Sequence, residues 1–150
     1  MALTWVDARN LIDAAFAAAR RHGSRPMAVV VVDAAAQVVA SGREDGASAL
    51  RLDIALGKAA AAAGVGVSSR VLGQRAKDLP VFFGAVAAMS ARTHQPFVPH
   101  TGAVLIRSAT GEVLGAAGAS GGTGDEDEEV VISGIRAAGL ICPEAQKENT

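Results

Sequence analysis

The apolar run from Met27 to Val32 sets the tightest limit on how this chain folds. The run is too short for a helix and rich in β-branched valine, which is the pattern of a buried strand. Residues 34–36 then form a short link to a second strand at 37–43, and the Asp45-Gly46 step ends that strand. The sequence therefore predicts a hairpin that begins with a buried strand.

A second hairpin is predicted in the last third of the chain, where residues 103–107 and 113–119 flank the turn Thr110-Gly111. Two hairpins with helices between them indicate an α+β fold, an antiparallel sheet covered by helices. The spacing of apolar and capping residues predicts helices over residues 4–22, 48–63, 68–76, 80–93 and 123–138.

Polar residues are expected to cap three of these helices. Thr4 with Asp7, and Thr123 with Glu126, have the spacing of a capping box, in which each side chain satisfies a free backbone N–H of the other residue. Ser48 is expected to cap the second helix.

The apolar half of the sequence consists mostly of alanine: 33 of the 150 residues are alanine, whereas aromatic residues make up only 3%. A core of alanine and glycine packs closely but buries little area per residue, so we expect further burial in a homo-oligomer. The 14 basic and 15 acidic residues leave a net charge of −1, which argues against a dedicated nucleic-acid binder.

Several features predict a single cytoplasmic domain. One cysteine, Cys142, cannot form an intrachain disulfide, which fits a reducing compartment, and no Cys or His spacing indicates a metal site. We expect no signal peptide, because Asp7 and Arg9 come too early in the chain. We expect no membrane span, because no apolar segment reaches about 18 residues. Residues 1–142 are expected to form the domain and residues 143–150 a disordered tail.

Four residues are candidates for chemistry. Arg43 ends the second strand and Lys58 lies on the next helix, so together they could hold a carboxylate or stabilise an enolate oxygen. The alternative for this pair is a surface ion-pair network. His100 lies in a loop before a strand, where functional groups are often placed, whereas His22 fits a cation at a helix C-terminus.

A glycine-rich segment, residues 115–124, leads into five consecutive acids at 125–129. Free N–H groups at the start of a helix can bind an anion, but these acids would repel a phosphate. The acids themselves could bind a hard cation or move protons, or they could simply form a solvated first turn that complements the helix dipole. We favour the solvated turn.

An ordered set of short motifs resembles the GlcG/HbpS family over about residues 4–141. The motifs are Val31-Val32-Asp33-Ala34, Gly42-Arg43-Glu44-Asp45-Gly46-Ala47, Lys58-Ala59, the strand from Gly102 to Arg107, and the glycine-rich segment that continues into Asp127. The resemblance implies a profilin-like α/β sandwich that assembles into dimers and often octamers. It also implies that some relatives bind or degrade haem, so haem is the cofactor to expect.

The resemblance further implies that a group of residues converges around one cleft. The loop before the strand at 103–107 departs from the family pattern, because His100 and Ala103 stand where relatives carry a Pro/Ala-Gly-Gly run. Ala103 restricts the backbone and His100 adds a titratable ligand. The residues that match the family pattern by position, and that the resemblance places around this cleft, are Asp33, Arg43, Asp45, Lys58, Gly102, Ser120, Gly121 and Asp127.

Three functions follow from these candidates. The first is a protein that binds haem or a similar planar anionic ligand, with His22 or His100 as axial ligand and Arg43 and Lys58 as partners of the propionates. The alternative is a cofactor-independent isomerase, cyclase or lyase of a small organic acid or carbonyl compound, in which Arg43 and Lys58 stabilise an oxyanion while Asp127 or His100 moves a proton. The third is a scaffolding oligomer without a ligand. We expect Lys58→Ala and His100→Ala to damage function more than stability, because neither residue needs to be in the core of alanine and leucine.

Overall fold

The computed structural model describes residues 2–142, so the tail predicted at 143–150 lies outside the described residues. The chain order is helix, hairpin, three helices, hairpin and helix, as the sequence predicts. The elements are α1 (Trp5–His22), β1 (Ala28–Asp33), β2 (Val38–Arg43), α2 (Leu50–Val65), α3 (Ser69–Asp78), α4 (Pro80–Arg92), β3 (Ala103–Arg107), β4 (Val113–Ser120) and α5 (Gly124–Ala137).

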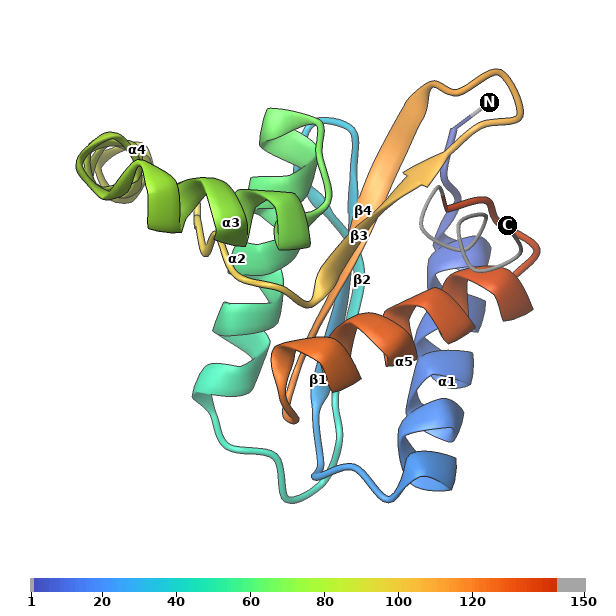
Figure 1. Cartoon of the computed structure of the whole chain (residues 1–150). Coiled ribbons are helices and arrows are strands. Elements are labelled where there is room, and N and C mark those ends of the chain that lie inside the picture. Colours follow the sequence, from blue (N-terminus) through green and yellow to red (C-terminus); the bar gives the residue numbers. More distant parts are fainter. Residues whose placement is uncertain (1, 143–150) are drawn as a thin grey trace.

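The four strands form one antiparallel sheet in the order β2-β1-β4-β3. Each predicted hairpin supplies two neighbouring strands, and β1 pairs with β4 to join the hairpins. Helices α1 and α5 cover one face of the sheet, whereas α2 lies on the other face with α3 and α4 beyond it (Figure 1). The α+β prediction is confirmed.

Strand β1 has a core on each of its faces, which explains its unbroken apolar sequence. Val29 and Val31 belong to the core under α1 and α5, whereas Val30 and Val32 belong to the core under α2. Successive side chains of a strand point to opposite faces, so a strand buried on both sides needs apolar residues at every position.

Two of the three predicted helix caps are confirmed. The Thr4 hydroxyl accepts from Asp7 N while Asp7 accepts from Thr4 N, and the Thr123 hydroxyl accepts from Glu126 N. The prediction for Ser48 is wrong: α2 begins at Leu50 after Ala49, and no side chain caps it. The backbone is already helical at Ala49, and Ser48 contributes its carbonyl to Arg51 N instead of its hydroxyl.

Glycines permit close contacts between the layers. A β-carbon at Gly118 of β4 would lie 2.6 Å from the carbonyl oxygen of Ala55 in α2, so α2 packs directly on the strand backbone. A β-carbon at Gly134 of α5 would lie 2.6 Å from the carbonyl oxygen of Leu11 in α1. The small residues of this sequence therefore set the distances between helices and sheet.

The outer edge of β3 is covered by the start of α3. The Ser69 hydroxyl contacts both Ala103 N (2.7 Å) and Ala103 O (3.2 Å), and the Ser68 hydroxyl accepts from Leu105 N. Two serine side chains thus satisfy backbone groups that a neighbouring strand would otherwise bind.

Within residues 2–142, no helix combines the length and apolar character that a membrane crossing requires. The longest helix, α1, carries five charged residues along its 18 positions.

Two glycine substitutions test the importance of the close contacts. We expect Gly118→Ala to destabilise the protein by about 1–3 kcal/mol, because the added methyl group meets the α2 backbone. Gly84→Ala in α4 is the matched control, since nothing lies within 4 Å of its β-carbon position, and it should be neutral or stabilise by up to about 1 kcal/mol. Urea unfolding measures both, and equal effects would contradict the packing argument.

Candidate functional site

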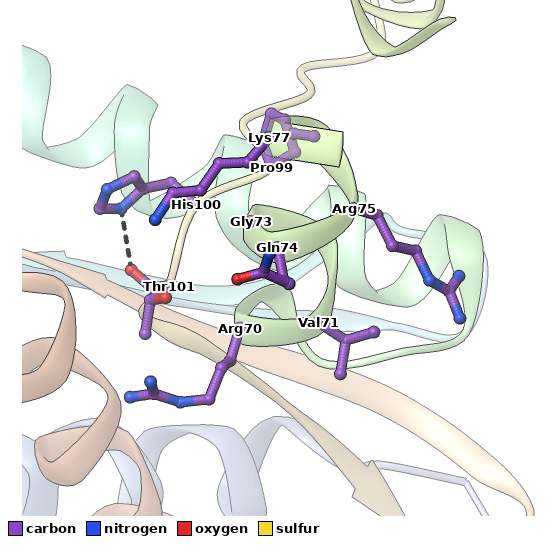
Figure 2. Close-up of a pocket in the computed structure, with 10 residues that line it drawn as sticks. Arg70, Val71, Gly73, Gln74, Arg75, Lys77, Pro99, His100 and Thr101 are labelled. Carbon is purple, nitrogen blue, oxygen red and sulfur yellow. Dashed lines mark hydrogen bonds between the residues drawn. The ribbon is translucent and has the colours of Figure 1, made fainter. Parts of the chain in front are cut away.

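A cavity of about 720 Å³ opens between α3 and the loop at residues 99–101 (Figure 2). The loop contributes Pro99, His100 and Thr101. Gly73 of α3 faces the loop: a β-carbon there would lie 3.8 Å from His100 Cα, which is an ordinary van der Waals contact. We call this cavity the His100 pocket; its α3 residues are Arg70, Val71, Gly73, Gln74, Arg75, Ala76 and Lys77.

Within residues 2–142, one hydrogen bond holds the imidazole of His100. Its Nδ1 atom lies 3.3 Å from the carbonyl oxygen of Thr101, a contact drawn in Figure 2. A carbonyl can only accept, so this contact requires Nδ1 to carry the proton and leaves the Nε2 lone pair of the neutral ring free. The ring also lies against the start of α5, with Cε1 3.3 Å from the β-carbon position of Gly124.

The α3 side of the His100 pocket is cationic. Arg70 donates from Nε to both carboxylate oxygens of Glu128 and from a terminal nitrogen to Asp125. The hydrogen bond to Glu128 has the larger effect and the one to Asp125 the smaller; both raise the pKa of Arg70 above its usual value, so the guanidinium stays charged. Arg75 and Lys77 form no ion pair within residues 2–142, so their charge remains available to an anion.

Lys58 and Asp127 form a buried ion pair behind this pocket. Lys58 Nζ lies 3.1 Å from Asp127 Oδ2 and also donates to Ala119 O. The other oxygen of Asp127 accepts from Gly122 N. Lys58 is only 4% exposed and Asp127 1%, so Lys58 is buried, a position that its sequence pattern did not require. Mutual pairing makes this burial tolerable.

Three further candidates surround the buried pair. Gly102 has φ +136°, and a β-carbon there would lie 2.7 Å from Lys58 Nζ, so glycine is required on both grounds. The buried Ser120 hydroxyl accepts from Arg51, a residue that sequence reasoning did not single out. Gly121 lies against Met27, with only 2.4 Å from its β-carbon position to Met27 Cβ. These residues support Lys58 and the sheet end, not the His100 pocket.

The other members of the expected cleft lie elsewhere. Arg43 donates to Ala47 O and, with Asp45, lines a separate shallow depression beside α1. Arg43 pairs with Ala28 of β1, and Ala28 pairs with Ser120 of β4, so Arg43 lies at the same end of the sheet as the strand end that Lys58 contacts. Asp33 lies at the opposite end of β1, where it accepts from Ala35 N and Gln37 N and shapes the hairpin turn. Asp33 therefore lies apart from the other residues of the expected cleft.

His22 and the acidic run complete the set of candidates. His22 Nε2 lies 4.0 Å from Glu129, on the side of the molecule formed by α1 and α5. Glu126 accepts from the Thr123 hydroxyl. Asp125, Glu126 and Glu129 are exposed, as expected for a solvated first turn. Glu128 is partly buried against Arg70, and Asp127 is buried against Lys58.

Most residues of the His100 pocket that sequence analysis missed belong to α3. Arg70, Gln74 and Lys77 are spaced four and three apart, so they lie on one helix face. That spacing was visible in the sequence. It did not indicate a site because the opposite wall is a loop that begins 22 residues after Lys77.

Comparisons with known proteins agree on one family. A family model described as haem degrading protein HbpS-like matches residues 3–136. A double mutant of HbpS from Streptomyces reticuli is 26% identical, with a TM-score of 0.76 over 91% of this chain and 86% of that chain. No curated protein matches the sequence.

Two more distant structures share the fold. A PduOC–haem complex is 23% identical, with a TM-score of 0.77 over 94% of this chain and 98% of that chain. The protein ORFY from Klebsiella pneumoniae is 20% identical, with a TM-score of 0.79 over 91% of this chain and 90% of that chain.

Replacement of Lys58 tests the role of the buried pair. We expect Lys58→Met to lower the free energy of unfolding by about 3–5 kcal/mol, because Asp127 is left buried without its cation. The double variant Lys58→Met/Asp127→Leu should recover most of this loss. Lys77→Met, at an exposed lysine, is the control and should change stability by less than about 0.5 kcal/mol. A Lys58→Met protein as stable as the control would refute the structural role.

Proposed function

Because this chain belongs to the HbpS-like family of haem-degrading proteins, we infer that it binds haem, or a similar planar anionic ligand, in the His100 pocket. One observation carries this proposal: the Nδ1 contact of His100 with the Thr101 carbonyl leaves Nε2 free. Histidines that bind a metal commonly donate their other ring N–H to a backbone carbonyl in this way, which holds the ring in position and selects the tautomer.

The remaining walls of the His100 pocket suit a tetrapyrrole. Val71, Ala76 and Pro99 supply apolar surface, and the volume of about 720 Å³ lies within the usual range of small-molecule sites. Lys77 and Arg75 would pair with the propionates, whereas Arg70 is already engaged by two carboxylates. Bound haem would supply an iron centre capable of redox chemistry. The protein's own contribution is to bind, orient and partly cover it.

The enzyme alternative has weaker support. Its oxyanion partners are both engaged, because Arg43 donates to Ala47 O and Lys58 is paired with Asp127. Among residues 2–142, neither Lys58 nor Asp127 lines the His100 pocket. We therefore assign Lys58, Gly102, Ser120 and Asp127 a structural role at the end of the sheet.

Self-association is the second part of the proposal. The N-terminal end of α4 exposes Leu79, Val81 and Phe82, and Val81 is 87% exposed. Helix α4 as a whole stands apart from the sheet (Figure 1). Adjacent exposed apolar side chains favour contact with another protein surface, and a second copy of the chain is the partner we propose.

A titration with haemin tests the ligand and its axial residue together. We expect a saturable shift of the Soret band at one haemin per chain, because the free Nε2 of His100 would bind the iron. The shift should be lost in His100→Ala. The variant His22→Ala removes the other candidate histidine and should titrate like the wild type.

The remaining outcomes decide against the proposal in different ways. Loss of the shift in His22→Ala alone would move the site to the end of α1. A featureless titration of the wild type would remove haem as the ligand and direct attention to small carboxylates and carbonyl compounds.

Light scattering tests the proposed self-association. We expect the wild type at micromolar concentration to exceed the 15.1 kDa mass of one chain, and Val81→Glu to return it to that mass, because a carboxylate at the interface is costly to desolvate. Leu50→Glu, at an exposed leucine of α2, is the control and should leave the mass unchanged. A monomeric wild type would exclude the proposal.

A further inference from the structure

A second concavity, of about 420 Å³, lies on the side of α4 that faces the body of the protein. It is lined by the turn between β1 and β2, the end of α2, helix α4 and the segment 95–97. We call it the Ser90 groove. Its lining residues are Ala34, Ala35, Ala36, Ala60, Ala63, Gly64, Val65, Val86, Met89, Ser90, Gln95, Pro96 and Phe97.

The hydroxyl of Ser90 lacks a protein partner. Ser90 is 6% exposed, yet its hydroxyl forms no hydrogen bond within residues 2–142. The nearby Thr93 hydroxyl, by contrast, donates to the carbonyl groups of Met89 and Ser90. Buried polar side chains are almost always hydrogen-bonded, and an exception in a concave site indicates a missing partner such as a ligand.

The lining of the Ser90 groove defines what that ligand would be. None of its residues is charged, so an ionic ligand would lose its hydration without gaining a counter-ion. Most of the surface comes from alanine and larger apolar side chains, and Phe97 is held in place by stacking on Phe83 with ring centroids 6.3 Å apart. Ser90 and Gln95 are the only polar side chains that line it. The His100 pocket, with three cationic side chains on α3, has the opposite character.

We propose that the Ser90 groove is a binding site for a small, neutral, mainly apolar molecule that carries one hydrogen-bonding group, which pairs with the Ser90 hydroxyl. The volume lies near the lower end of the range for small-molecule sites, which suits a molecule of about one aromatic ring and a few substituents. This site shares no lining residue with the His100 pocket and does not depend on haem binding.

Phenol and toluene are matched probes, because they differ in a single hydroxyl group. With ¹³C-methyl-labelled methionine, Met89 reports on the groove, whereas Met27, buried in the main core, is an internal control. We expect phenol to shift Met89 saturably and to leave Met27 unchanged. Ser90→Ala should weaken phenol binding by about threefold to tenfold, the usual effect of one lost hydrogen bond, without weakening toluene binding.

Two control variants separate this site from the other proposals. Ser41→Ala, at an exposed serine of β2, and His100→Ala should both bind phenol like the wild type. Equal phenol affinity of the wild type and Ser90→Ala would overturn the proposal. An absent Met89 shift would also overturn the proposal. A Met89 signal that responds to protein concentration instead of phenol would overturn it as well, because it would show that a second copy of the chain covers the groove.

Discussion

The fold depends on backbone-to-backbone approach between its layers. Where α2 crosses β4, and where α5 crosses α1, one partner has no side chain, and the atoms opposite are carbonyl oxygens or alanine methyl groups. Such contacts tolerate no added volume. They also bring the α2 backbone so close to the sheet that Lys58 reaches the end of β4 and hydrogen-bonds to Ala119. The position of the buried cation thus follows from the small residues around it.

The first turns of α5 join this buried pair to the candidate ligand site. Residues 125 and 128 are three apart and share a helix face, which is turned toward Arg70 of α3. Asp127 points to a different side of the helix and meets Lys58 of α2. One short acidic segment therefore holds two helices that lie on the opposite face of the sheet. The loop with His100 runs between these contacts, so its position depends on both.

Local signals in the sequence predicted the local structure well. The valine run, the turn residues, the capping box at Thr4 and the hydroxyl cap at Thr123 depend on neighbours within a few positions, and the structure confirms them. Within the described residues, the reciprocal bond from Thr123 N to Glu126, which completes a capping box, does not form. Ser48 failed as a cap because a helical Ala49 precedes α2, a choice of backbone that the residue type does not encode.

Contacts between distant segments were harder to predict. Lys58 looked like an exposed cation because its partner, Asp127, is 69 residues away within a run of acids that are mostly exposed. The family resemblance supplied the right candidates for the buried cluster, Lys58, Gly102, Ser120 and Asp127. It also grouped them with Asp33, which lies at the opposite end of β1, and with Arg43, whose side chain donates to Ala47 O. Charge and spacing alone do not reveal which side chains of distant segments meet.

The two serines that cover β3 also limit how this protein can assemble. A sheet with two open edges can accept a new strand at each and grow into a fibre. Here Ser68 and Ser69 occupy the backbone groups at one edge, while within residues 2–142 the strand at the other edge, β2, pairs only with β1. Pairing of sheets through β2 would therefore stop at two copies, and a larger particle would need contacts other than strand pairing.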